Sequence, residues 1–93
     1  MKIENYIWLS DIIDKLAFKH HVDASEVEEV FDNRPKIRFV QKGYSKGEDV
    51  YIALGRSAAG RYLAVIFIHK NNNALILSAR DMAKRERKQY ERK

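Results

Sequence analysis

The sequence of 93 residues predicts an α+β domain: two N-terminal helices, a four-stranded antiparallel meander sheet and a C-terminal helix. Two observations predict this order. Apolar residues recur at helical spacing before Pro35 and alternate at strand spacing after it. Short turns rich in Gly, Asn and Ser separate the strand segments, as expected for antiparallel neighbours. A second core would not fit in this length, so we expect one domain spanning residues 1–93.

Two helices are expected before Pro35. The first carries an apolar stripe with Ser10 as its N-cap, and the stripe comprises Leu9, Ile12, Ile13, Leu16, Ala17 and His20. The second begins at Asp23, which forms a capping-box pattern with Glu26. Proline ends it, because it disfavours helix in the residue before it. Residues 2–9 fit either a short strand or a lead-in to the first helix.

Four strands are expected after Pro35, at residues 37–41, 50–54, 62–68 and 74–79. The third is apolar on both faces and is therefore placed in the sheet interior. Asn71–Asn73 is expected to form a hairpin tip, since Asn tolerates left-handed backbone. Ser78 and Asp81 have capping-box spacing, so the final helix is expected to open there.

Composition excludes several classes of protein. The absence of cysteine excludes disulfides and thiolate metal sites and suits a reducing cytoplasm. The longest apolar run, Tyr62 to Ile68, is far short of the roughly 20 residues of a membrane span, and no secretion signal opens the chain. The three His do not pair at ligand spacing, so no metal or other cofactor is expected. We expect a cytoplasmic protein that does not interact with membranes.

Charge is unevenly distributed along the chain. Residues 1–33 carry three bases and eight acids, a net charge of −5, whereas residues 34–93 carry fifteen bases and five acids, a net charge of +10. One face would then suit nucleic acid and another would repel it. The alternative is that the two halves only neutralise each other in the fold.

The C-terminal segment from Arg80 to Lys93 has seven bases and three acids, a net charge of +4. Such a helix favours an anionic partner, of which nucleic acid is the commonest macromolecular kind. Its outer face would gather RNA, and we assign RNA binding there to Lys84, Lys88 and Arg92. On the inner face Glu86 needs a partner, which Arg87, Arg80 or Lys19 could supply. Tyr90 could pack or direct its hydroxyl at a phosphate.

Strand direction places Arg61 near Arg80. Arg61 and His69 share a strand face but lie roughly 26 Å apart at about 3.3 Å per residue, so they cannot act on one phosphate. The antiparallel hairpin brings His69 to Ala74 and Arg61 to the end at residues 78–80. The alternative for Arg80 is a salt bridge to the acidic helices.

Three further residues are open to two interpretations. Lys19 and His20 could serve as acid, base or phosphate contact, or His20 could be a half-buried residue that terminates a helix. Trp8 is either a core anchor or a surface on which an RNA base stacks. His21 stands where a helix-ending glycine would be expected, and is therefore interpreted as structural or exposed.

Five blocks of residues in this order resemble the BrnT family, toxins of bacterial type II toxin–antitoxin modules with a RelE-like ribonuclease fold. The resemblance covers nearly the whole chain, and its last block is the most specific. The blocks are Trp8; Lys19-His20-x-Val22 leading to Glu26-Val27-x-x-Val30-Phe31; Gly47-Glu48-Asp49-x-Tyr51 leading to Leu54-Gly55; Gly60-Arg61-x-Leu63-x-Val65; and Ile76-x-Ser78-Ala79-Arg80-Asp81-Met82 with Glu86-Arg87-x-x-Tyr90.

The resemblance implies an RNA-cleaving toxin neutralised by a cognate antitoxin, often in a heterotetramer whose antitoxin dimer binds operator DNA. It assigns no role to His21, where many members have glycine, or to His69. If cleavage is metal-independent, the RNA 2′-hydroxyl attacks its own phosphate. Arg61 and Arg80 would then stabilise the phosphorane charge, and Lys19, His20 or Tyr90 would transfer protons.

Two other functions remain open from the sequence. The basic helix could track phosphates without catalysis, in a module that binds RNA or DNA. Alternatively, the chain could be a dormant interaction subunit whose basic helix docks an acidic antitoxin segment.

Overall fold

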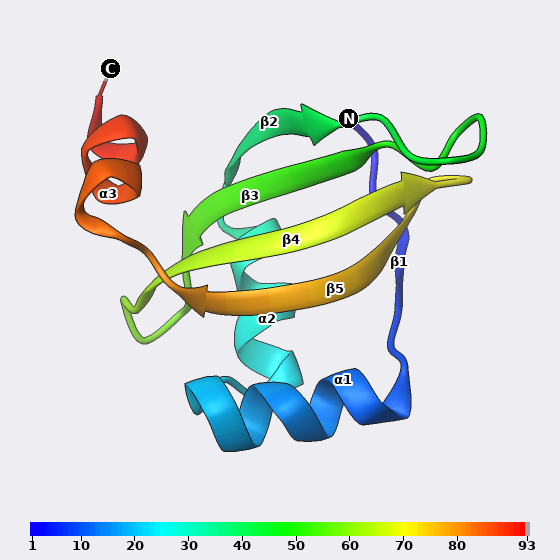
Figure 1. Ribbon diagram of the computed structural model, residues 1–93. Coiled ribbons are helices and arrows are strands. Elements are labelled where there is room, and N and C mark those ends of the chain that lie inside the picture. The colour runs from blue at the N-terminus through cyan, green and yellow to red at the C-terminus, as the bar shows by residue number, and fades with distance from the viewer. Residues whose placement is uncertain (93) are drawn as a thin grey trace.

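The computed structural model describes residues 1–92 and shows five strands and three α-helices, one of which continues into a π-helical turn (Figure 1). Lys93, the last base counted in the C-terminal segment, lies outside the described residues. The elements are β1 (Asn5–Ile7), α1 (Ser10–Lys15), η1 (Leu16–His20, the π-helical turn), α2 (Ala24–Asp32), β2 (Lys36–Gln41), β3 (Val50–Arg56), β4 (Tyr62–Lys70), β5 (Asn73–Asp81) and α3 (Lys84–Glu91). Among the described residues, no helix has the length and apolar character that crossing a membrane requires.

The sheet has five strands in the order β1-β5-β4-β3-β2, so the predicted four-stranded antiparallel sheet was incomplete. Strands β2 to β5 form the expected meander, but β1 pairs in parallel with β5, Asn5 opposite Asn73. A three-residue strand is too short to show alternation. Its position depends on distant contacts, including the Glu4 N–H, which donates to the Asn72 carbonyl at 2.6 Å.

The helices before β2 lie where they were expected, with changes at the ends of the first. Leu9 rather than Ser10 is the N-cap of α1, and the last turn, η1, is π-helical. His21 ends this turn in the left-handed conformation with φ of 53°, and its side chain is exposed as expected. The start of α2 is confirmed, because the Asp23 N–H donates to Glu26 Oε1 at 3.1 Å.

The boundary between β5 and α3 differs from the prediction of a helix opening at Ser78. Strand β5 continues to Asp81, with Arg80 opposite Ala64 and Asp81 opposite Leu63 of β4. The helix begins only at Lys84, where the Ala83 N–H donates to Glu86 Oε1 at 2.8 Å. Ladder pairing with β4 overrides the local capping pattern at Ser78. Arg80 is therefore a strand residue.

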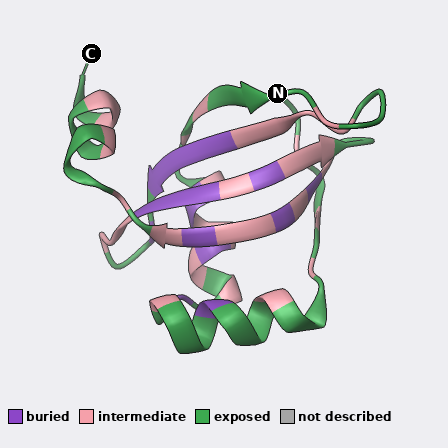
Figure 2. Ribbon diagram, viewed as in Figure 1, coloured by how far each residue is buried: buried purple, intermediate pink, exposed green. Residues whose placement is uncertain are grey.

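The two faces of the sheet bury separate apolar clusters. The larger lies between the sheet and α1, η1 and α2 and includes Leu16, Val27, Val30, Leu63 and Phe67. The smaller comprises Ile52, Leu54 and Ala64, with Ile66, Met82 and Tyr90 packed against it beside α3. Burial is concentrated in the central strands (Figure 2). Helix α3 covers only one end of the sheet face that carries the smaller cluster, so no helix covers much of that face (Figure 1).

Gly55 allows α2 to approach the sheet closely. A Cβ atom there would lie 2.8 Å from Val30 Cγ1 and 3.3 Å from Pro35 Cβ. We predict that Gly55→Ala lowers the free energy of unfolding by about 1–3 kcal/mol through overpacking, measured by urea denaturation. If the clash is the cause, Gly55→Ala combined with Val30→Ala will lose less stability than the sum of the two single changes. Additive losses would contradict this explanation.

Candidate active site at the end of β5

Arg61 joins three parts of the chain at the end of the sheet. Its Nε donates to Asp81 Oδ1 at 2.8 Å, one Nη2–H to Asp81 Oδ2 at 3.3 Å and the other to the His20 carbonyl at 2.9 Å. Its Nη1 donates to the His21 carbonyl at 2.6 Å and to Glu26 Oε1 at 3.5 Å. A guanidinium has five N–H donors, so every donor of Arg61 has a partner within the protein.

The contacts of Arg61 fix the end of η1 against β5 and α2. The last carbonyls of a helix lack intrahelical partners, and here a cation binds two of them. The Arg61 hydrogen bond, with a smaller contribution from nearby His20, lowers the pKa of Asp81. The carboxylate in turn raises the pKa of Arg61, so the pair remains charged. His20 is therefore held beside Asp81 by its own backbone.

Arg80 forms a second ion pair, on the other face of the sheet. Its Nη1 and Nη2 donate to Glu86 Oε1 and Oε2 at 2.6 and 2.8 Å, a bidentate arrangement. Of the three partners considered for Glu86, Arg80 is thus confirmed. Its hydrogen bond is the main cause of the lowered pKa of Glu86. The Glu86 side chain is only 14% exposed, whereas that of Arg80 is 39% exposed.

The expected clamp of Arg61 and Arg80 on a single phosphate is not formed. Arg61 does lie at the Arg80 end of the sheet, and His69 lies opposite Ala74 at the other end, as predicted. However, Arg61 contacts η1 and α2, whereas Arg80 contacts α3. The side chains of a strand alternate between faces, and Arg80 follows Ala79, which is buried in the larger cluster. The prediction failed because it treated Arg80 as helical.

The other residues predicted for the site lie at both faces. Tyr90 packs on the smaller cluster with its ring centroid 5.9 Å from that of Tyr62. Lys19 is exposed on η1, and the three cations assigned to the outer face of α3, Lys84, Lys88 and Arg92, are all exposed. Trp8 packs against the larger cluster, and its indole N–H donates to Glu28 Oε2 at 3.0 Å. A carboxylate at this position disfavours a nearby RNA phosphate.

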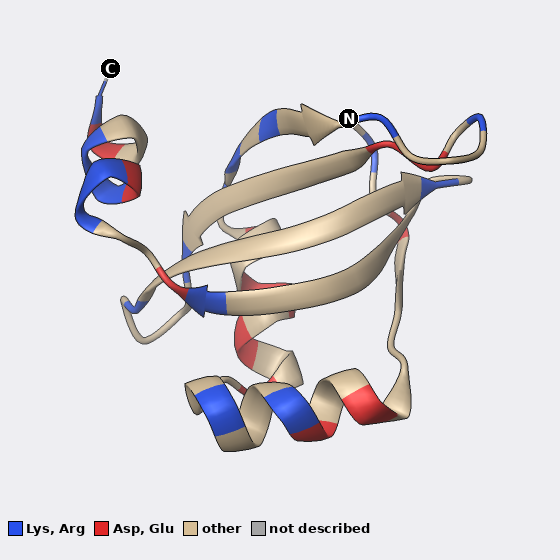
Figure 3. Cartoon of the chain, in the orientation of Figure 1, with Lys and Arg blue, Asp and Glu red and all other residues tan. Residues whose placement is uncertain are grey.

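Basic residues of β2 and β3 extend the α3 face and were missed by the sequence reasoning. Lys36 and Arg38 lie opposite Leu54 and Ile52 of the smaller cluster, and Arg56 ends β3 on the same face. Strand alternation, applied to every base after Pro35, could have found them. The carboxylates of α2 lie on the other side of the sheet, behind it in Figure 3. The two faces of the sheet therefore differ in charge.

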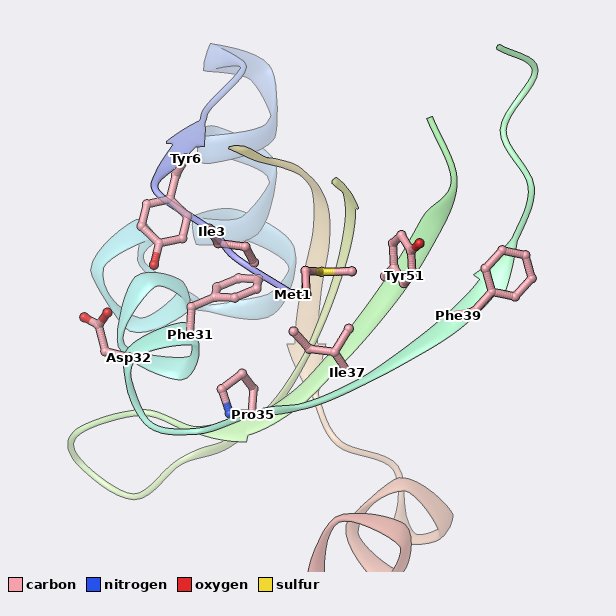
Figure 4. A pocket seen from close by; sticks show the side chains of 9 residues that line it. All are labelled: Met1, Ile3, Tyr6, Phe31, Asp32, Pro35, Ile37, Phe39 and Tyr51. Carbon is pink, nitrogen blue, oxygen red and sulfur yellow. The ribbon is translucent and has the colours of Figure 1, made fainter. Parts of the chain in front are cut away.

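One cleft lies away from these residues. It has a volume of about 550 Å³ and is lined by Met1, Ile3, Tyr6, Phe31, Asp32, Pro35, Ile37, Phe39 and Tyr51 (Figure 4). Most of the residues that line it are aromatic or apolar, and Asp32 contributes a carboxylate. Burial raises the pKa of Tyr6, and the nearby carboxylates of Asp32 and Glu28 raise it further. This cleft does not suit a polyanion.

Within residues 1–92, no group of three or more His, Asp or Glu side chains is arranged to hold a metal ion.

Comparison with known families identifies the family to which this chain belongs. Residues 11–86 match the family described as ribonuclease toxin, BrnT, of type II toxin–antitoxin system. The chain belongs to the BrnT family. The matched region runs from α1 into α3 and includes both ion pairs, so the BrnT assignment rests on the part of the chain that builds the candidate site. Membership implies RNA as the substrate and an antitoxin as a partner. No curated protein showed significant similarity to the chain.

The two ion pairs of this BrnT domain predict a loss of stability in acid. Both carboxyl groups have a folded pKa below their ordinary values of 3.8 for Asp81 and 4.5 for Glu86. Their contribution is therefore fully present above about pH 5 and is lost as pH falls through the lowered folded values. Urea denaturation between pH 7 and pH 3 should show this loss, and it should be smaller in Asp81→Asn and Glu86→Gln. If both variants lose as much stability in acid as the wild type, the two ion pairs are not the cause of the loss.

Proposed function

We propose that this BrnT-family protein is an endoribonuclease toxin that cleaves RNA by metal-independent acid–base chemistry. The observation that supports this most is the state of the Arg80 guanidinium. Glu86 and the Asp81 carbonyl engage three of its N–H donors, and Nε–H and one Nη2–H have no partner within residues 1–92. A preorganised guanidinium with two free donors on an open sheet face suits a phosphate.

Arg80 would stabilise the charge that develops on the phosphorane. Glu86 fixes the plane of the guanidinium through its bidentate contact, so little reorganisation is needed when the substrate binds. The lowered pKa of Glu86 keeps it a carboxylate at neutral pH and makes it a weak proton acceptor. We therefore assign Glu86 to positioning rather than to proton transfer.

The proton transfers are assigned to His20, with Tyr90 and Lys19 as the other candidates. His20 lies beside Asp81 at the end of η1, and imidazole is the side chain best suited to accept and return a proton near neutral pH. Arg61 would act on catalysis through His20, because its Nη2 holds the His20 carbonyl. In this proposal, Arg61 is a positioning residue.

The RNA would cross the outer edge of β5, which separates His20 from Arg80. β1 pairs only with Asn73, Ala74 and Leu75, so residues 76–81 have no strand on that side within the described chain. A phosphate at this edge could approach Arg80 from one face and His20 from the other. Trp8 lies on the face of α2 and would not contact this RNA.

Neutralisation is assigned to a cognate antitoxin that covers the exposed cations of α3, Lys84, Lys88 and Arg92. An acidic segment there would compete with RNA for the same charge. A heterotetramer with an antitoxin dimer, which alone contacts operator DNA, is the assembly we propose. The family description supports the antitoxin as a partner, and the heterotetramer and the operator DNA are our extension of it.

Labelled RNA incubated with the pure chain and a chelator should be cleaved and should end in a 2′,3′-cyclic phosphate. Arg80→Ala should reduce cleavage by at least about a hundredfold, the scale of losing one transition-state donor. The variant should remain folded by circular dichroism and should still bind the antitoxin.

Arg34→Ala is the matched control, since Arg34 is exposed in the turn after α2, away from β5, and should cleave normally. Salt-sensitive RNA binding without cleavage by the wild-type chain would refute the nuclease. The result would favour the phosphate-tracking module that the exposed cations of α3 also allow. Cleavage that requires a divalent ion would refute the metal-independent scheme.

A further inference from the structure

Tyr62 lies between basic side chains from two different elements. The guanidinium carbon of Arg56, at the end of β3, is 4.8 Å from the centre of its ring, and that of Arg87, on α3, is 4.0 Å away. The edge-on contact with Tyr90 fixes the ring itself. We call Arg56, Tyr62 and Arg87 the Tyr62 stack. Its members come from β3, β4 and α3, so the folded sheet assembles it.

The backbone provides room for Arg56. Gly60 has a φ of 91°, and a Cβ atom there would lie 2.9 Å from Arg56 Nη2. A side chain at Gly60 would therefore push the guanidinium away from the ring. The position of Arg56 therefore depends on the Tyr62 ring and on the absence of a side chain at Gly60.

The charge of the Tyr62 stack is poorly compensated. Arg87 has one carboxylate neighbour, Glu91 Oε1 at 3.6 Å, and both side chains are more than half exposed, so this pair contributes little. Within residues 1–92, Arg56 forms no ion pair. Cation–π contacts at exposed sites contribute little to stability, and two cations around one ring repel each other. An anion bound beside the two guanidiniums would offset this positive charge.

The Tyr62 stack lies next to Arg80. Tyr62 and Ala64 share a strand face, and Arg80 is directly opposite Ala64, so Arg80 and Tyr62 are diagonal neighbours at a Cβ separation on the order of 7 Å. The Met82 N–H also donates to the Tyr62 carbonyl at 3.1 Å. This spacing places the stack beside any phosphate that Arg80 holds.

We propose that the Tyr62 stack is a binding subsite for the backbone phosphates of single-stranded RNA that flank the phosphate held at Arg80. The inference rests on the proposed function and extends it, because it assigns a path for the RNA beyond the phosphodiester bond that is cleaved. Both guanidiniums pack on the ring, so Tyr62 positions cations rather than stacking on a base. Binding at the stack is therefore independent of RNA sequence.

The test measures binding of a 2′-O-methylated RNA oligonucleotide, which lacks the attacking hydroxyl, over a range of salt concentrations. Arg56→Gln with Arg87→Gln should weaken binding at low salt by about tenfold and reduce the slope of log affinity against log salt by about 1.4, since each phosphate contact contributes roughly 0.7. Lys42→Gln with Lys46→Gln is the control of equal charge, placed in the distant loop between β2 and β3. Equal salt slopes in the two double variants would overturn the proposal.

A second pair of variants separates position from charge. Tyr62→Leu removes the ring without changing net charge and should weaken binding, whereas Tyr62→Phe keeps the ring and should bind as the wild type does. Thermal unfolding checks that both are folded. If Tyr62→Leu is unfolded, Gly60→Ala replaces it and should weaken binding by displacing Arg56. Full affinity in the folded variant would overturn the proposal.

Two outcomes separate this inference from the nuclease itself. If the salt slopes of the variants are as predicted but the wild-type chain cleaves no unmodified RNA, the proposed nuclease activity is refuted and the proposed subsite is not. Cleavage by the wild type with no change of slope in Arg56→Gln with Arg87→Gln refutes only the subsite. If that double variant keeps its RNA affinity but loses the antitoxin, the Tyr62 stack is a protein contact and the proposal fails.

Discussion

The geometry of the whole end of the sheet depends on the Arg61 guanidinium. It contacts η1, α2 and β5 together, through two carbonyls and two carboxylates. A lysine could not replace it, because an ammonium has three donors and no planar fork. Because every N–H is engaged within the protein, we propose that this arginine orders the site rather than binding substrate. The consequence is a fixed platform on which His20 and Asp81 lie together.

The two ion pairs lie on opposite faces of the sheet, and their surroundings differ in charge. On the face of α1 and α2 the guanidinium is saturated and the surrounding charge is largely acidic. On the α3 face Arg80 keeps free donors, and the neighbouring bases of β2, β3 and α3 are more numerous than the acids. Adjacent positions at one strand end can therefore have opposite roles, because alternation directs neighbouring side chains to different faces.

Some local patterns predicted local features correctly, whereas Ser10 is not the N-cap of α1 and no helix opens at Ser78. The capping pair of α2 and the left-handed Asn71 and Asn72 follow from residue chemistry alone. The approach of Arg61 to the end of β5 followed from strand direction. In contrast, its carbonyl partners lie 40 and 41 residues away, and no spacing rule indicates them. The same holds for β1, whose pairing is determined by the core. The face of Arg80 could have been predicted had the last strand been continued beyond Ala79 to include Arg80.

The parallel contact between β1 and β5 joins positions near the two ends of the chain, since Glu4 and Asn72 are 68 residues apart. Contacts over such a separation form only after most of the chain is available, and they slow folding. His20 lies near the start of the chain and Arg80 near its end, so the site is subject to the same delay. During synthesis, β5 leaves the ribosome after η1. A nascent chain that stops before β5 therefore cannot bring Arg80 and His20 together.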